Sequence, residues 1–216
     1  MGTVVVPTAE TVRLTYLMER LVKVNAPVMF VGSAGTGKTV LVSDFLSSLS
    51  VTDEAYKFSS INMNFYTDSF ALQQQLEQSI DKRSGKTYGP PGGSKLVYFI
   101  DDLNLPFVET YGTQTPIALM RQHIDHGSWF DRSDMSLKKQ IVDSQYICCM
   151  NQKSGSFFVD PRLQVSVCVC IYIGVRVVYV KPLFTIGYSS RWLGMCDRTS
   201  GGSLQSIGFI SSSIPL

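Results

Sequence analysis

The chemistry-bearing residues of this chain are concentrated in residues 32–39, which match the pattern G-x-x-x-x-G-K-[ST] in full. Gly32, Gly35 and Gly37 should take backbone angles that a Cβ would forbid, so that N–H groups can turn inward around the β-phosphate oxygens of a nucleotide. Lys38 adds a mobile positive charge for the β- and γ-phosphates, and the Thr39 hydroxyl can ligate Mg²⁺. A glycine-rich turn that binds nothing would leave the lysine and the threonine unexplained. The motif predicts these nucleotide-binding residues: Gly32, Ser33, Ala34, Gly35, Thr36, Gly37, Lys38, Thr39 and Val40.

A second pattern, the apolar run 96–100 followed by Asp101 and Asp102, is typical of a buried central strand that delivers acids to its carboxyl end. This is a Walker B pattern. We expect Asp101 to hold Mg²⁺, usually through water, and Asp102 to orient an attacking water. Such acid pairs are common at strand ends, but this one follows a complete phosphate-binding motif.

A further polar residue, Asn151, follows the largely apolar run 145–150, which predicts another buried strand. It should reach the same sheet edge as Lys38 and Asp101, where it could contact the γ-phosphate or the attacking water. An ordinary turn asparagine is the alternative. His123 and His126 lie three apart near a helix end with no third ligand nearby, so no metal other than Mg²⁺ is predicted.

Helices and strands that alternate along the sequence are expected to position these residues. Apolar spacing, with Val12, Met18 and Val22 on one stripe, predicts an amphipathic helix over 8–24 that packs beside the phosphate-loop strand. It also predicts a strand over 57–65 and a helix over 68–80. Residues 81–93 are turn-rich and predict a surface loop. Thr115 and Pro116 start a further helix that carries Ile117, Met120 and Ile124 inward. The pattern favours an α/β fold, a three-layer P-loop NTPase core with a parallel sheet.

The composition of the chain argues against some classes of binding partner and of cellular compartment. The 216 residues are 44% hydrophobic and carry a formal net charge of +2 with no basic run, which gives nucleic-acid binding no support. Five cysteines, an odd count without a C-x-x-C pair, are typical of reduced thiols in the cytoplasm rather than of disulfides or zinc. The first residues lack the basic and apolar regions of a signal peptide, so none is expected.

Five segments together resemble one AAA+ module of a dynein heavy chain, most closely the third module of the axonemal outer-arm type. The resemblance extends over about residues 4–164, and 100–106 with 119–132 are its most specific parts. The segments are 27–39, 88–92, 98–106, 119–132 and 149–151.

The resemblance implies several roles. Val5 and Val6 match a loop that touches adenine, so the nucleotide would be ATP or ADP. Asn151 matches the sensor I residue, and Arg162 lies where the family contacts the nucleotide of a neighbouring module. Neighbouring AAA+ modules of one heavy chain would be the direct partners. Dynein intermediate and light chains, microtubules and the ciliary axoneme of the cytoskeleton would be reached only through that longer parent.

Two departures qualify this expectation. Asp102 stands where a hydrolysing AAA+ site usually has glutamate, so hydrolysis becomes doubtful and a regulatory role is expected. After Gln164 the family pattern stops, which predicts a truncated module over 1–164, incomplete at its C-terminal end. Residues 165–216 are then expected to be a divergent tail that is foreign to the fold. The β-branched run 165–180 is compatible with a substitute strand. A membrane span is not expected, because Gly174 and Arg176 interrupt a run shorter than the roughly 17–25 apolar residues a bilayer needs.

Two other classes of function stay open at this point. The chain could be a free-standing AAA+ remodelling ATPase that forms rings of identical subunits. It could also be a nonenzymatic nucleotide sensor, or a fragment with no function of its own. The resemblance also implies a small helical lid after residue 164, with further contacts to the nucleotide, and residues 165–216 do not match it. Without that lid, we expect weak ATP binding or poor solubility.

Overall fold

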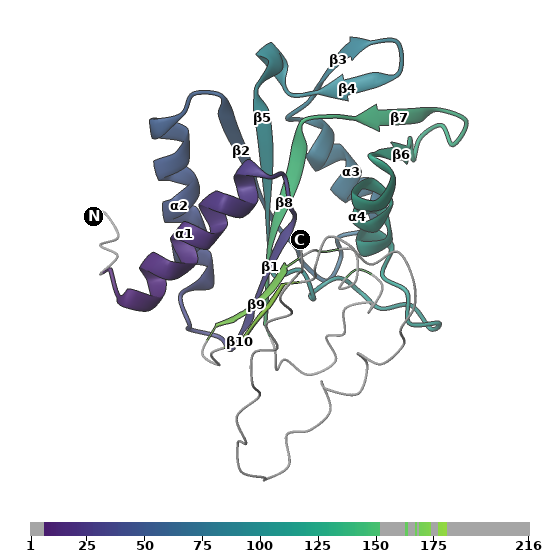
Figure 1. Cartoon of the computed structure of the whole chain (residues 1–216). Coiled ribbons are helices and arrows are strands. Elements are labelled where there is room, and N and C mark those ends of the chain that lie inside the picture. Colours follow the sequence, from purple (N-terminus) through teal and green to yellow (C-terminus); the bar gives the residue numbers. More distant parts are fainter. Residues whose placement is uncertain (1–6, 152–162, 164–166, 168, 174–176, 181–216) are drawn as a thin grey trace, which may run out of the picture. The chain divides into compact units, whose positions relative to one another are not determined.

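A six-stranded sheet forms the centre of the computed structural model, which describes residues 7–151, 163, 167, 169–173 and 177–180 (Figure 1). Its order is β10-β9-β1-β8-β5-β2; every neighbouring pair from β9 to β2 is parallel, and β10 runs antiparallel to β9. The α/β class with a parallel sheet, predicted from the sequence, is confirmed. The strands are β1 (Val28–Gly32), β2 (Tyr56–Asn62), β5 (Lys95–Asp101), β8 (Ser144–Asn151), β9 (Val169–Ile173) and β10 (Val177–Val180).

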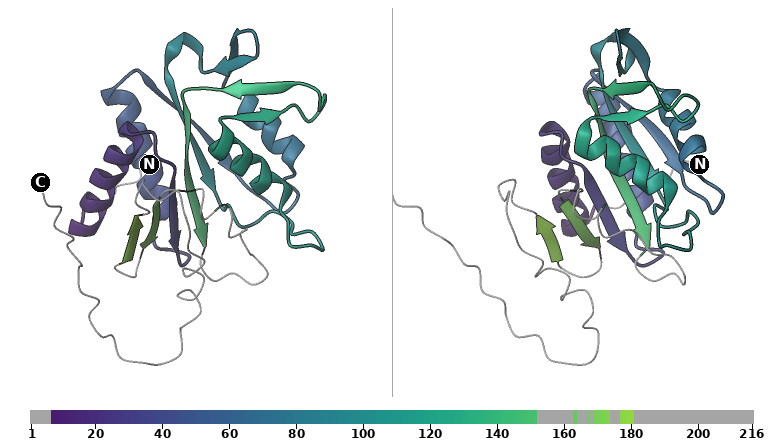
Figure 2. Two further views of the ribbon diagram at one scale, coloured as in Figure 1. Left: turned by 45° about the vertical axis from the view of Figure 1, so that its right-hand side comes forward. Right: turned by 90° about the vertical axis from the view of Figure 1, so that its right-hand side faces the viewer.

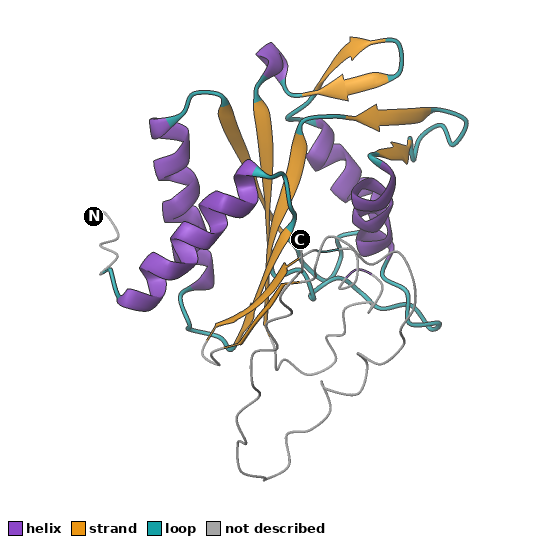
Figure 3. Cartoon of the chain, in the orientation of Figure 1, coloured by secondary structure: helices purple, strands orange, loops and turns teal. Residues whose placement is uncertain are grey.

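Helices cover both faces of this sheet and make three layers (Figures 2 and 3). On one face, α1 (Ala9–Lys23) and α2 (Lys38–Thr52) enclose a core with β1, β5 and β8. On the other face, α3 (Ser69–Glu77) and α4 (Thr115–His126) enclose a second core. The central strands are apolar along their length because both of their faces are covered.

The first helix shows how local sequence sets these elements. The Thr8 hydroxyl accepts from the Thr11 N–H, and the Thr11 hydroxyl accepts from the Thr8 N–H, which makes a capping box at the start of α1. Met18 and Val22 are buried in the core that contains β1, as predicted. Val12, which the periodicity placed on the apolar stripe, is instead 58% exposed.

A second, four-stranded sheet was not expected. Its order is β3-β4-β7-β6, and the prediction that 81–93 is a surface loop is wrong. Gly85 has φ +55°, which lets the chain reverse between β3 and β4. All four residues of β3 are exposed and polar, and three of them are charged, so no apolar alternation marked the hairpin. The elements are β3 (Asp81–Ser84), β4 (Thr87–Gly89), the 3₁₀ turn η1 (Pro91–Gly93), β6 (Ser128–Phe130) and β7 (Lys138–Ile141).

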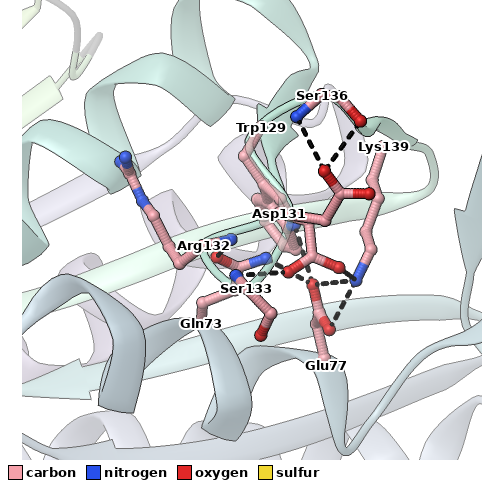
Figure 4. Close-up of polar contacts among 9 residues, drawn as sticks. Gln73, Glu77, Trp129, Asp131, Arg132, Ser133, Ser136 and Lys139 are labelled. Atoms are coloured by element: carbon pink, nitrogen blue, oxygen red, sulfur yellow. Dashed lines mark hydrogen bonds and ion pairs between the residues drawn. The ribbon is translucent and has the colours of Figure 1, made fainter.

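A polar cluster joins this second sheet to α3 (Figure 4). Lys139 is only 7% exposed, and its Nζ lies 2.9 Å from both carboxylate oxygens of Glu77 and 2.8 Å from Asp131 Oδ2. The Trp129 indole N–H donates to Glu77 at 3.1 Å. The hydrogen bond from Lys139 lowers the pKa of Asp131, and the two carboxylates raise the pKa of Lys139 against its desolvation. We call Glu77, Trp129, Asp131 and Lys139 the Lys139 cluster.

His123 belongs to the core rather than to a ligand set. Its Nδ1 lies 2.7 Å from the Tyr146 hydroxyl and its Nε2 lies 3.3 Å from the Ser144 hydroxyl. The ring also packs edge-on against Trp129 and Tyr146. Burial lowers the pKa of His123 to about 4. These contacts account for a buried histidine at this position.

The run after Gln164 contributes strands to the main sheet. β9 pairs in parallel with β1 from Val28 to Gly32, and β10 returns beside β9. Of the two interpretations of 165–180, the structure thus shows the substitute strand at 169–173, followed by another at 177–180. The division into a module over 1–164 and a foreign tail stays a prediction. Within the described ranges, none of the helices has both the length and the apolarity needed to cross a bilayer.

Candidate functional site

The phosphate-loop motif lies between the end of β1 and the start of α2. Gly35 and Gly37 both have φ +78°, a conformation that side chains with a Cβ rarely adopt, and Gly37 caps α2. Gly32 does not have a positive φ, contrary to expectation; it is the buried last residue of β1. The other loop residues, Ser33, Ala34 and Thr36, are exposed. The N-terminal N–H groups of the 15-residue helix α2 therefore lie at an exposed loop whose backbone conformation depends on glycine.

Lys38 folds its side chain back over this loop. Its Nζ donates to the carbonyl oxygens of Gly32 at 2.9 Å and Ser33 at 2.8 Å, and lies 3.3 Å from the Thr36 hydroxyl. Within the described part of the chain, no carboxylate forms an ion pair with it. The ammonium group thus contacts only neutral oxygens, and its charge is left for an anion at the loop.

Thr39 and Asp101 meet beside the loop. The Thr39 hydroxyl donates to Asp101 Oδ2 at 2.8 Å, although the two residues are 62 positions apart in sequence. The other Asp101 oxygen accepts from the Asp102 N–H at 3.0 Å. A hydroxyl and a carboxylate are the hard oxygen ligands that Mg²⁺ prefers, so the donor set fits this ion. Two protein ligands do not complete an octahedron, and phosphate oxygens and water would supply the rest.

Asp102 follows β5 in a left-handed conformation, with φ +52°. This turn sends the chain back over the end of the sheet and leaves the Asp102 side chain exposed at the carboxyl edge. Partial desolvation and the neighbouring Asp101 carboxylate raise the pKa of Asp102, and Lys38 offsets part of that rise. The carboxylate lies in the field of both charged residues of the site.

Asn151 ends β8, the strand between β1 and β5, and pairs in register with Gly32. It lies at the edge where β1 delivers the phosphate loop and β5 delivers Asp101, as predicted. The structure thereby brings together the loop, Lys38, Thr39, Asp101, Asp102 and Asn151. Val40 lies in the first turn of α2, 44% exposed. Val5, Val6 and Arg162 lie outside the described residues.

One residue of this edge was missed from the sequence. The Asn104 side-chain N–H donates to the Asn151 carbonyl at 3.2 Å, and Asn104 is only 1% exposed. Its position just after the acid pair was the available signal. Because an asparagine in a loop usually serves its own turn, spacing alone gave it no role.

A phosphate loop between the first strand and the next helix of a parallel sheet, with a carboxylate at the end of β5, defines a P-loop nucleotide-binding protein of the AAA+ class. The family model described as the P-loop containing dynein motor region matches residues 1–173. The chain belongs to this family.

Curated relatives agree with this assignment. The chain is 52% identical over 159 residues to dynein axonemal heavy chain 9 of Homo sapiens, and this match covers 74% of the chain and 4% of that protein. It is 48% identical over 169 residues to the ciliary dynein beta chain of Heliocidaris crassispina, a match that covers 78% of this chain and 4% of that protein. It is 47% identical over 165 residues to the dynein alpha chain, flagellar outer arm, of Chlamydomonas reinhardtii, a match that covers 76% of this chain and 4% of that protein. The chain thus spans about 4% of the length of the curated relatives it matches.

Proposed function

We propose that this chain is an ATP-binding module of an axonemal dynein heavy chain, and that Mg–ATP or Mg–ADP binds at the carboxyl edge of its sheet. One observation carries the proposal: the Thr39 hydroxyl and the Asp101 carboxylate meet at 2.8 Å. They do so beside Lys38, whose ammonium contacts, among the residues that the structure describes, only carbonyl and hydroxyl oxygens. Anion, cation and helix N-terminus would then share one small region.

The surroundings of the site follow from the family resemblance. Val5 and Val6 would touch the adenine, Asn151 would contact the γ-phosphate or the attacking water, and Arg162 would serve the nucleotide of an adjacent module. The proposed module is the third of an outer-arm heavy chain. Relatives named as axonemal, ciliary and flagellar outer-arm dyneins support placing it in the ciliary axoneme.

We further propose that hydrolysis is slow or absent and that the module is regulatory. Aspartate at position 102 is one methylene shorter than the glutamate usual at hydrolysing sites, so its carboxylate would hold water at a different place. Asp102→Glu should then raise the steady-state rate of phosphate release from ATP without weakening ATP binding. An unchanged or lower rate in this variant would contradict the idea that side-chain length limits hydrolysis.

Titration calorimetry with Mg–ATP tests the site itself. Lys38→Ala should weaken binding by at least about tenfold, since it removes a charge-assisted contact worth about 1.5–3 kcal/mol. Its melting profile in nucleotide-free buffer should be unchanged, because Lys38 stabilises no distant element. Lys57→Ala, an exposed lysine on β2, is the matched control and should bind as the unaltered chain does. Equal affinity in both variants would overturn the proposal, and hexamers on adding ATP would favour a free-standing ring instead.

A further inference from the structure

The loop that follows β5 continues the pairing between β5 and β8 beyond the last strand residues. Sheet pairing ends at Ile100 and Cys148. The Leu103 N–H then donates to the Cys149 carbonyl at 3.0 Å, and the Asn104 side-chain N–H donates to the Asn151 carbonyl at 3.2 Å. Successive carbonyls on one side of β8 are therefore held by the loop that begins at Asp102.

The hydrogen bond from Asn104 holds the backbone of Asn151, which lies at the candidate nucleotide site. The Asn151 carbonyl carbon is bonded to the same Cα that carries the Asn151 side chain, and Asn151 is the register partner of Gly32, where the phosphate loop begins. Asn104 thus connects the acid-bearing loop after β5 to the strand end that faces the phosphate loop.

The burial of Asn104 makes its hydrogen bond to Asn151 important for the position of the strand end. Asn104 is 1% exposed and the preceding Leu103 is fully buried. Water cannot readily replace a hydrogen bond in such a position, so loss of the amide would leave the carbonyl at the end of β8 without this donor. A backbone end that is no longer held can shift, and a shift of its side chain would be felt first by the group it contacts.

We propose that Asn104 is a positioning residue that holds Asn151 in place to recognise the γ-phosphate of ATP. This inference rests on the proposed function, in which Asn151 contacts the γ-phosphate. It deepens that function by assigning the preference for ATP over ADP to the Asn104–Asn151 pair. ADP lacks the γ-phosphate, so its binding through the loop and Lys38 should not depend on this pair.

The test compares the affinities of ATP and ADP for the full chain, by calorimetry in Mg²⁺ buffer. Asn104→Ala should reduce the ATP-over-ADP affinity ratio by about five- to tenfold, the effect of about one hydrogen bond, with ADP affinity unchanged. Asn151→Ala should reduce it at least as much. The double variant should show no further loss, because Asn104 acts through Asn151. If Asn104→Ala fails to fold, Asn104→Leu fills the space without a charge and still removes the donor.

Gln145→Ala is the matched control at the opposite end of β8. Gln145 is also buried, and its side-chain N–H also donates to a backbone carbonyl, that of Val22, at 3.2 Å. It should lower stability and leave the ATP-over-ADP ratio unchanged.

Three results would overturn the assignment of Asn104: equal losses for ATP and ADP, additive losses in the double variant, or an unaltered chain that does not prefer ATP. Failure of the unaltered chain to bind any nucleotide would instead overturn the proposed function itself.

Discussion

At the amino end of the central strands, Lys139 contacts two carboxylates. At the carboxyl edge, the partners of Lys38 within the described part of the chain are carbonyl and hydroxyl oxygens. β4 leads into β5 and β7 leads into β8, so the second sheet and the Lys139 cluster adjoin the strand starts. One lysine is buried and neutralised by the protein itself. The other is on an open loop and has no internal counter-ion among the described residues.

This difference separates a structural charge from a functional one. Burying an ion pair costs desolvation, so a buried lysine is kept only where its partners compensate it. Lys38 is only half-buried at a helix N-terminus, so its charge loses less hydration and can neutralise a ligand. Stability should therefore depend on the amino end, and nucleotide binding on the carboxyl edge.

The largest stability effect is expected from Lys139→Met. It leaves Glu77 and Asp131 close together without their cation, which should lower the free energy of unfolding by about 3 kcal/mol. Urea denaturation in nucleotide-free buffer measures this. Lys138→Met, an exposed neighbour on β7, is the control and should change stability by less than about 0.5 kcal/mol. Equal small losses in the two variants would mean that the Lys139 cluster contributes little.

Acid should destabilise the amino-end core through His123, whose pKa of about 4 in the folded chain lies below the ordinary 6.5. Between these values the unfolded chain binds a proton that the folded chain does not, so stability falls as pH falls from 6.5. The loss should reach about 2 kcal/mol at pH 5 and level off below pH 4.

Unfolding curves recorded across this pH range test the effect. His123→Gln should remove that part of the pH dependence, and His126→Gln, which alters the chain's other histidine, should keep it. A slope that persists in His123→Gln would assign the titration to another group.

Thr39→Val should have only a small effect on stability, less than about 1 kcal/mol, because the Thr39–Asp101 hydrogen bond is exposed to water. The same variant should weaken Mg–ATP binding measured by calorimetry. A large loss of stability would place Thr39 with the structural residues and erase the contrast between the two ends.

The contrast also explains what could be predicted from the sequence. The phosphate loop, the acids after β5 and the position of Asn151 all follow from apolar strands that end in polar residues, a pattern visible locally. The Lys139 cluster could not be predicted in this way, because Lys139 and Glu77 are 62 positions apart. Sequence alone also does not distinguish a buried lysine from an exposed one. The second sheet was missed because its strands are three or four residues long and largely polar.

The Mg²⁺ dependence of ATP affinity in the unaltered chain and in Asp101→Asn tests most directly whether one ion and its phosphates are shared by Lys38, Thr39 and Asp101. The unaltered chain should bind ATP at least about tenfold more tightly with Mg²⁺ than with excess chelator, the effect of about 1.4 kcal/mol. Asp101→Asn should bind ATP equally under both conditions. Mg²⁺ dependence that survives intact in Asp101→Asn, or its absence from the unaltered chain, would contradict the account.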